Sequence, residues 1–225
     1  TATRVAVADT VGEVLAVVTG PAGNPNSVGL EVSAQRIRAA AERCLRQAGA
    51  TGAADGDLVR SAVIGLAGGA RADDAFLDAV LPPVVGVRPR LVSDLSVAFS
   101  SATPLPEGYV LVAGTGAVAG RILDGDLMQR RDGWGWLLGD DGSGYWLGRE
   151  AVRATLARLQ AGRRPIGALG EAVLAVAGTR DPVTLVQLGY ANPPVWLAGF
   201  AELVSRHGDD PVAAGIAARA ADHLL

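Results

Sequence analysis

The chain has 225 residues, of which 49% are hydrophobic and 19% are charged, and its net charge is −3. This length supports a sizeable core in one large or two small domains, and the slightly acidic balance gives no sign of nucleic acid or an anionic membrane as a partner. The single cysteine, Cys44, excludes a disulfide within one chain, and no apolar run is long enough to span a bilayer, so a cytoplasmic protein is expected.

The first half of the chain alternates between predicted strands and helices. Alternating apolar residues predict strands over residues 1–9 and 13–19, and the Gly/Pro/Asn-rich stretch 20–29 is predicted to be a loop. Helical periodicity over residues 32–48 places Cys44 on the apolar face. The further elements are a buried strand over 58–67, a helix over 73–81, a strand over 90–92 and a helix over 95–100.

The second half begins after a Pro-containing connector, residues 103–107. We therefore expect one domain over residues 1–107 and a second over 108–225. An apolar strand over 109–113 is followed by a second apolar run that ends at Asp124-Gly125, a strong hairpin signal, and by a strand over 128–131. Helices are predicted over residues 143–159, 171–177, 182–188, 193–206 and 210–225.

Glycine-rich segments between residues 114 and 144 are the most informative part of the sequence. Gly114-Thr115-Gly116 follows a buried strand, and such a turn lets main-chain N–H groups approach a phosphate, although a plain tight turn would look the same. Gly133-Trp134-Gly135 and the run 139–144 are too rich in glycine for regular core elements. Trp134 and Trp136 could be core residues, or they could belong to a shaped loop.

Two polar residues in the first half are candidates for a site. Asp94 follows a strand and opens a helix, where aspartate is a preferred N-cap. Asn24 lies in the predicted loop over residues 20–29, and asparagine is an ordinary turn former. The residues alone favour the helix cap for Asp94 and the turn for Asn24.

These segments together resemble the sugar-kinase branch of the acetate kinase/hexokinase/Hsp70 superfamily. The chain is most similar in character to the N-acetylglucosamine kinases and the related BadF/BadG-type ATPases. The resemblance is carried by Gly114-Thr115-Gly116, Gly133-Trp134-Gly135 and residues 139–146. It implies an α/β fold with two ribonuclease-H-like (actin/hexokinase-type) domains and a cleft between them. The richness in Ala, Gly, Val and Arg predicts a GC-rich bacterial genome, most simply an actinobacterial one.

The resemblance also implies roles for individual residues. Asp94 matches the aspartate that acts as general base on the sugar hydroxyl and also contacts the sugar. The other implied sugar-binding residues are Asn24, Gly133, Trp134, Gly135 and Asp140. The implied ATP-phosphate-binding residues are Thr1, Thr3, Gly114, Thr115 and Gly116. Mg²⁺ is expected to arrive with ATP, because two scattered histidines and one cysteine do not predict a metal cage within the protein.

The resemblance predicts an ATP-dependent amino-sugar kinase that phosphorylates N-acetylglucosamine at the 6-hydroxyl, with glucosamine as the competing substrate. A BadF-like activator ATPase is the alternative from another class, but Cys44 alone does not supply ligands for an iron–sulfur cluster. A catalytically inactive sugar sensor is the third alternative. The expected partners are the amino sugar, ATP and a second copy of the chain. In such kinases an acidic, glycine-rich phosphate loop leads into the first strand, and an adenosine loop follows the helices. Thr1 and Thr3 match the end of the phosphate loop, and we expect its start and the adenosine part to be missing from this sequence.

Overall fold

The structure, a computed structural model, describes residues 2–50, 59–66, 74–81, 86–162 and 165–225. Its contacts divide the chain into two compact units, Thr1–Ala102 and Thr103–Leu225. Strands and helices occur in both units, so the predicted α/β class is confirmed. The predicted domain boundary after residue 107 and the predicted cleft stay predictions, and the two units are described separately below.

The strands of the first unit form two small pairs. β1 (Thr3–Ala8) and β2 (Val14–Gly20) are antiparallel, with Thr3 opposite Gly20, and β3 (Val63–Leu66) and β4 (Arg90–Ser93) are parallel. The carboxylate of Asp9 closes the β1–β2 turn, because its Oδ1 accepts the N–H groups of Val11 at 2.9 Å and Glu13 at 2.8 Å.

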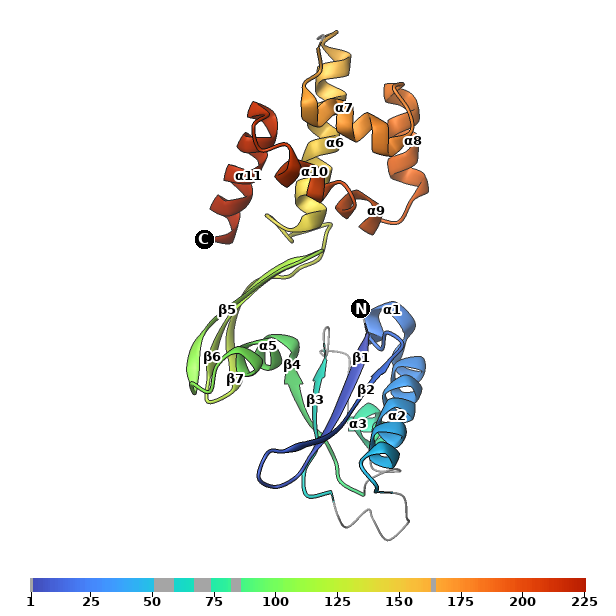
Figure 1. Cartoon of the computed structure of the whole chain (residues 1–225), viewed down its shortest axis with the longest axis vertical. Helices are drawn as coiled ribbons and strands as arrows, with labels where there is room; N and C mark the ends of the chain where they lie inside the picture. The colour runs from blue at the N-terminus through green and yellow to red at the C-terminus, as the bar shows by residue number, and fades with distance from the viewer. Residues whose placement is uncertain (1, 51–58, 67–73, 82–85, 163–164) are drawn as a thin grey trace. The chain divides into compact units, whose positions relative to one another are not determined.

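Helices cover these strands and complete the core of the first unit. α2 (Leu30–Gln47) runs alongside the β1–β2 hairpin (Figure 1) and buries Cys44 completely, as its apolar face predicts. α3 (Asp74–Val80) adds Phe76 and Val80 to a core that also contains Ile64 and Leu66 of β3.

The loop predicted for residues 20–29 is wrong over four of its residues, which form the short helix α1 (Pro25–Val28). Proline suits the first position of a helix, because its missing N–H would have no intrahelical partner there. The N–H of Val28 donates to the carbonyl of Asn24 at 3.1 Å. Asn24 is therefore fixed at the entrance of a helical turn rather than within an irregular loop.

The second unit begins with a three-stranded antiparallel sheet. Its strands are β5 (Glu107–Ala113), β6 (Ala117–Leu123) and β7 (Asp126–Asp132), in that order. Asp124 and Gly125 both have positive φ, 52° and 79°, as the predicted two-residue hairpin turn requires. The sheet presents the Gly114–Gly116 turn at the end that lies next to the helices (Figure 1).

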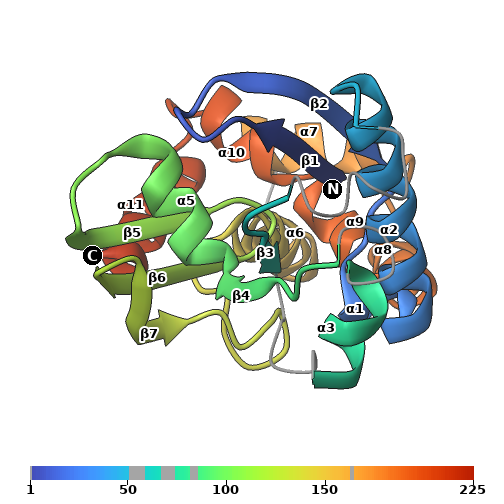
Figure 2. The ribbon, with the colours of Figure 1, turned by 90° about the horizontal axis from the view of Figure 1, so that it is seen from below.

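The helices of the second unit gather around α6 (Gly144–Gln160), which Figure 2 shows nearly end-on. The others are α7 (Ala168–Ala177), α8 (Pro182–Ala191), α9 (Val195–Ala198), α10 (Ala201–Arg206) and α11 (Pro211–Leu224). Their core includes the fully buried side chains Leu174, Leu185, Phe200 and Ile216. No helix in the described ranges is long and apolar enough to cross a membrane.

The single helix predicted over residues 193–206 is wrong, because the chain turns at Gly199 and Phe200 between α9 and α10. Glycine is a poor helix former, and the turn places the ring of Phe200 in the core, where it is 1% exposed. The preceding residues approach α6 so closely that a Cβ on Gly148 would overlap the carbonyl oxygen of Leu197.

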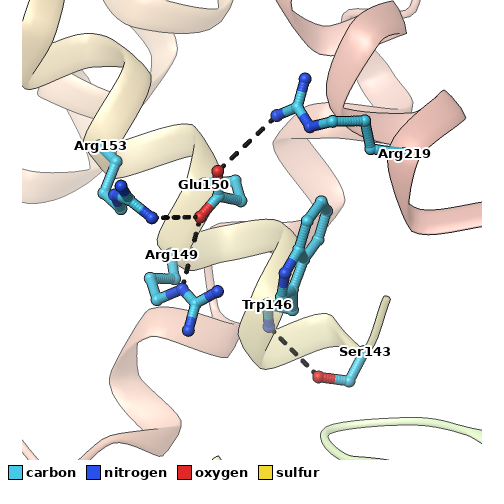
Figure 3. A network of polar contacts seen from close by, with 6 residues as sticks. All are labelled: Ser143, Trp146, Arg149, Glu150, Arg153 and Arg219. Atoms are coloured by element: carbon cyan, nitrogen blue, oxygen red, sulfur yellow. Dashed lines mark hydrogen bonds and ion pairs between the residues drawn. The ribbon is translucent and has the colours of Figure 1, made fainter. Parts of the chain in front are cut away.

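An ion-pair network joins α11 to α6 (Figure 3). Glu150 lies 3.0 Å from Arg153, 3.4 Å from Arg149 and 3.6 Å from Arg219 of α11. The guanidinium of Arg219 also lies over the ring of Trp146, 5.8 Å from its centroid. The carboxylate of Glu150 is satisfied by these arginines, so we interpret the network as a contact that aligns the two helices.

Candidate active site

The Gly114–Gly116 turn is fixed by hydrogen bonds of its own carbonyl groups. The N–H of Gly114 donates to the carbonyl of Gly116 at 2.9 Å. The carbonyls of Gly114 and Thr115 accept the N–H groups of Gly144 at 2.8 Å and Tyr145 at 3.0 Å. Among the described residues, no acceptor is found for the N–H groups of Thr115 and Gly116. The carbonyl groups of the turn are thus hydrogen-bonded, and the N–H groups of Thr115 and Gly116 remain as donors. Main-chain N–H groups arranged in this way bind anions.

The start of α6 lies directly against this turn. Ser143 caps the helix, because its hydroxyl oxygen accepts the N–H of Trp146 at 3.2 Å (Figure 3). A Cβ on Gly144 would lie 3.0 Å from the carbonyl oxygen of Gly114, so a larger residue would push the turn away. The positive end of the helix dipole adds to the attraction for an anion.

Asp140 links the loop after β7 to the same turn. Its Oδ1 accepts the N–H of Ala117 at 3.2 Å, and a Cβ on Gly116 would lie 2.9–3.0 Å from its carboxyl atoms. Burial raises the pKa of Asp140 above its usual value, and the negative charges of Asp132 and Asp141 act in the same direction. The predicted sugar-binding carboxylate therefore lies beside the predicted phosphate turn.

Asp132 organises this loop and was not among the residues that the sequence predicts for the site. Its Oδ1 accepts the N–H of Asp140 at 2.9 Å and that of Trp134 at 3.3 Å, and its Oδ2 accepts the N–H of Asp141 at 3.0 Å. Burial acts to raise the pKa of Asp132, but the N–H donors outweigh it and hold the pKa below its usual value. The signal that could have identified it is an aspartate directly before Gly133 at the end of a strand.

The Gly-Trp-Gly segment forms an exposed loop, so the interpretation of Trp134 as a core residue is wrong. Trp134 is 71% exposed, and Gly133 and Gly135 have φ of 71° and 86°, a conformation that favours glycine. Leu137 and Leu138 are also exposed, at 72% and 75%. The loop thus presents an aromatic ring and two aliphatic side chains to solvent.

In the first unit, Asp94 is the first residue of α5 (Asp94–Ala102), directly after β4. The N-cap interpretation of Asp94 is wrong, because the hydroxyl of Ser93 accepts the N–H of Ser96 at 2.9 Å and takes the capping role. Oδ1 of Asp94 accepts the adjacent N–H of Leu95 at 3.0 Å, and the residue is exposed. Its carboxylate is accessible to a ligand.

Thr3 contacts the segment that leads to Asn24. The hydroxyl of Thr3 donates to the carbonyl of Pro21 at 2.8 Å, and a Cβ on Gly23 would lie 2.7 Å from its oxygen. Thr3 therefore holds the residues before Asn24 against β1. Asn24 itself is half-buried and has an interaction partner of its own. Thr1 lies outside the described residues.

An open cavity of about 440 Å³ lies beside the turn in the second unit. Gly114, Gly142 and Gly144 line it together with apolar and small residues of α6, α10 and α11. The described residues contain no group of three or more His, Cys, Asp or Glu side chains that could hold a metal ion.

Two curated proteins are similar to this chain, and no profile of a known protein family matches it. An N-acetylmuramic acid/N-acetylglucosamine kinase from Clostridium acetobutylicum is 33% identical over 96 residues, which are 41% of this chain and 31% of that protein. An N-acetyl-D-glucosamine kinase from Dictyostelium discoideum is 31% identical over 163 residues, which are 69% of this chain and 51% of that protein. The chain therefore matches about half or less of each relative.

Solved structures share the fold. A proposed N-acetylglucosamine kinase from Chromobacterium violaceum is 25% identical, with a TM-score of 0.77, and the match covers all of this chain and 77% of that one. A second proposed N-acetylglucosamine kinase, from Porphyromonas gingivalis, is 21% identical, with a TM-score of 0.70 and coverage of 96% and 73%. The chain thus has the fold of these proteins, and its similarity to sugar kinases agrees with the resemblance carried by its glycine-rich segments.

Proposed function

We propose that this chain provides the sugar- and phosphate-binding parts of an ATP-dependent kinase that phosphorylates N-acetylglucosamine at its 6-hydroxyl. The observation that carries the proposal is the contact between Asp140 and Ala117, which brings a carboxylate suited to sugar hydroxyls against a turn suited to phosphates. The similarity to two curated proteins named as kinases of N-acetylated amino sugars supports the same activity.

Each named residue has a physical role in this proposal. The exposed carboxylate of Asp94 accepts the proton of the attacking sugar hydroxyl. The N–H groups of Thr115 and Gly116 bind phosphate oxygens, and the start of α6 supports them electrostatically. ATP with Mg²⁺ supplies the transferred phosphoryl group. Asn24, Trp134 and Asp140 position the sugar, and Thr3 keeps the segment before Asn24 in place.

The exposed loop favours an N-acetylated sugar over glucosamine. Trp134, Leu137 and Leu138 are all more than two-thirds exposed, at 71%, 72% and 75%, and offer apolar surface to the methyl of an acetyl group. Glucosamine carries a charged ammonium at that position and gains nothing from such a surface. The name of the Clostridium relative adds N-acetylmuramic acid to the sugars that need testing.

The activator-ATPase alternative is disfavoured by the environment of Cys44. The side chain is fully buried, and its sulfur lies 3.4 Å from the carbonyl oxygens of Val5 and Ala16. A thiol enclosed by α2 and the β1–β2 hairpin is unsuited to share a cluster with another subunit. A sensor without catalysis, a homodimer and a cytoplasmic location stay predictions.

The test is ADP release by the full-length gene product with Mg-ATP and separate sugars: N-acetylglucosamine, N-acetylmuramic acid, glucosamine and glucose. We expect turnover with N-acetylglucosamine that falls by about 10³-fold or more in Asp94→Asn, because general-base catalysis and charge at the reacting hydroxyl are both removed. Sugar-independent ADP release would favour the activator ATPase. Sugar binding without turnover would favour the sensor.

A further inference from the structure

We propose that Asp132 is a positioning residue whose carboxylate fixes the loop of residues 133–141 and thereby sets Asp140 against the phosphate turn. The consequence for substrate affinity rests on the kinase function proposed above. The structural part of the inference, that one carboxylate orders this loop, stands on contacts within the second unit alone.

The loop closes around the carboxylate of Asp132 from both ends. Trp134 donates its N–H from the beginning of the loop, and Asp140 and Asp141 donate theirs from its end. Gly139 passes so close that a Cβ there would overlap Oδ1 of Asp132. The N–H groups of Leu138 and Gly139 also donate to the carbonyl of Gly135 within the loop. Because hydrogen bonds to an ionised acceptor are stronger than such neutral ones, we infer that the three contacts of Asp132 constrain the loop most strongly.

The backbone conformation of the loop is intrinsically disfavoured, so the loop needs contacts that hold it. Asp132 and Asp140 both have a φ of 57°, in the left-handed region that residues with a Cβ rarely adopt. Gly133 and Gly135 have positive φ as well. A segment rich in glycine and in strained residues would sample many conformations without specific bonds to select one.

Asp132 can fix the conformation of the loop because the sheet holds its own backbone in place. It lies opposite Val118 in the β6–β7 pairing, and Nε of Arg130 donates to its carbonyl at 2.9 Å. Asp140, at the other end of the loop, accepts the N–H of Ala117, the residue next to Val118. Both ends of the loop are therefore anchored on neighbouring residues of β6, directly after the Gly114–Gly116 turn.

The structural part is tested by amide hydrogen exchange on Asp132→Asn in the full chain without ligands. Asparagine keeps the size and tolerates positive φ, but it lacks the charge and replaces one acceptor oxygen with an NH₂ donor. We expect amides of residues 134–141 to exchange about tenfold faster or more, with α6–α11 unchanged. Asp222→Asn removes the same charge from an exposed position of α11 and should leave the loop as in the wild type. Unchanged loop exchange in Asp132→Asn would overturn the proposal.

The functional part is tested by separating KM from kcat. A positioning role predicts that Asp132→Asn raises KM for both the sugar and ATP by about tenfold, because the sugar loop and the phosphate turn lose the same constraint. A change that only lowers the folded fraction would reduce apparent kcat and leave both KM values unchanged, and that result would contradict a positioning role. If the wild type shows no sugar-dependent ADP release, the kinase proposal fails, while the exchange result still decides the role of Asp132 in the loop.

Discussion

The backbone N–H of Ala117 donates a hydrogen bond to Oδ1 of Asp140 across 3.2 Å, between residues that are 23 positions apart in the chain. This bond joins a loop that the sequence assigns to the sugar with a turn that it assigns to phosphates. The turn is in addition bonded to the first residues of α6, through Gly144 and Tyr145. A change in the loop should therefore affect the turn.

Asp140→Asn should stabilise the protein slightly at neutral pH while it weakens sugar binding. Burial raises the pKa of Asp140, so the folded chain holds this proton more tightly than the unfolded chain, and ionisation of the group opposes folding. The expected gain is less than about 1 kcal/mol, because the residue is partly exposed and solvent screens its charge. Asparagine can still accept the N–H of Ala117, so the loop should keep its shape.

The measurement is the melting temperature of both proteins as a function of pH. The difference should be present at neutral pH and should disappear as the pH falls towards the usual aspartate range, because protonation then removes the charge in the wild type as well. KM for the sugar should rise about tenfold or more through loss of charge-assisted hydrogen bonds. A variant that is less stable at neutral pH would show that ionised Asp140 supports the fold.

Ser93→Ala should lower stability by about 1 kcal/mol and reduce kcat, because Ser93 caps the helix that carries Asp94. Ser101→Ala is the matched control, since it removes a hydroxyl from the other end of the same helix, where it bonds to the carbonyl of Ala98. Urea unfolding and steady-state kinetics measure the two effects. Equal effects of the two substitutions on kcat would contradict a special role for the cap.

Gly65→Ala should destabilise the first unit by about 1–3 kcal/mol, because β3 passes too close to α5 for a side chain at this position. A Cβ on Gly65 would overlap Cγ2 of Val97 and lie 3.2 Å from its Cβ. Because α5 begins with Asp94, a shift of this helix should also lower kcat. The double variant Gly65→Ala/Val97→Ala restores space and should recover most of both losses. If the double variant did not recover, the loss in Gly65→Ala would not come from the contact with Val97.

Asp210→Ala should lower the free energy of unfolding by about 2–3 kcal/mol, because one buried carboxylate accepts N–H groups at the starts of two helices. Its Oδ1 accepts the N–H of Val212 in α11 at 2.8 Å, and its Oδ2 accepts that of Leu169 in α7 at 3.1 Å. Asp209→Ala, at the exposed neighbouring position, should change stability by no more than about 0.5 kcal/mol. Urea unfolding of both variants measures the difference.

The destabilisation caused by Asp210→Ala should depend on pH. Burial acts to raise the pKa of Asp210, but the N–H donors of Leu169 and Val212 outweigh it and keep the pKa below its usual value. The stabilisation should therefore be complete above the unfolded pKa of about 3.9 and be lost as the pH falls through the lower folded value. A cost of Asp210→Ala that stays constant into strong acid would contradict this account.

The sequence predicts regular elements well where periodicity or turn chemistry is strong. Asp124-Gly125 forms the expected hairpin, and Asp210-Pro211 opens the expected helix. The helix α1 could not be predicted, because four residues are too few for a helical period and Pro25 fits a loop equally well. The break at Gly199 depends on the packing of Phe200 against distant residues, which no local pattern contains.

For the site, the sequence identifies residue types but not their partners. It marks Asp94 and Asp140 through the resemblance, and the structure shows that Ser93 rather than Asp94 caps α5. The bond of Asp140 to Ala117 joins two segments that only the folded sheet brings together. The sequence marks Asp132 only by its place before Gly133 at the end of a strand. Its role depends on three backbone N–H groups whose positions arise from the loop conformation.

The central claim is that this chain carries the binding and catalytic groups of an amino-sugar kinase, and one measurement tests it most directly. ADP release by the full-length gene product is followed with Mg-ATP, with and without N-acetylglucosamine, for the wild type and Asp94→Asn. The account predicts release that requires the sugar, together with a 6-phosphorylated product, and a loss of about 10³-fold or more in the variant. Sugar-dependent release that Asp94→Asn leaves unchanged would contradict it.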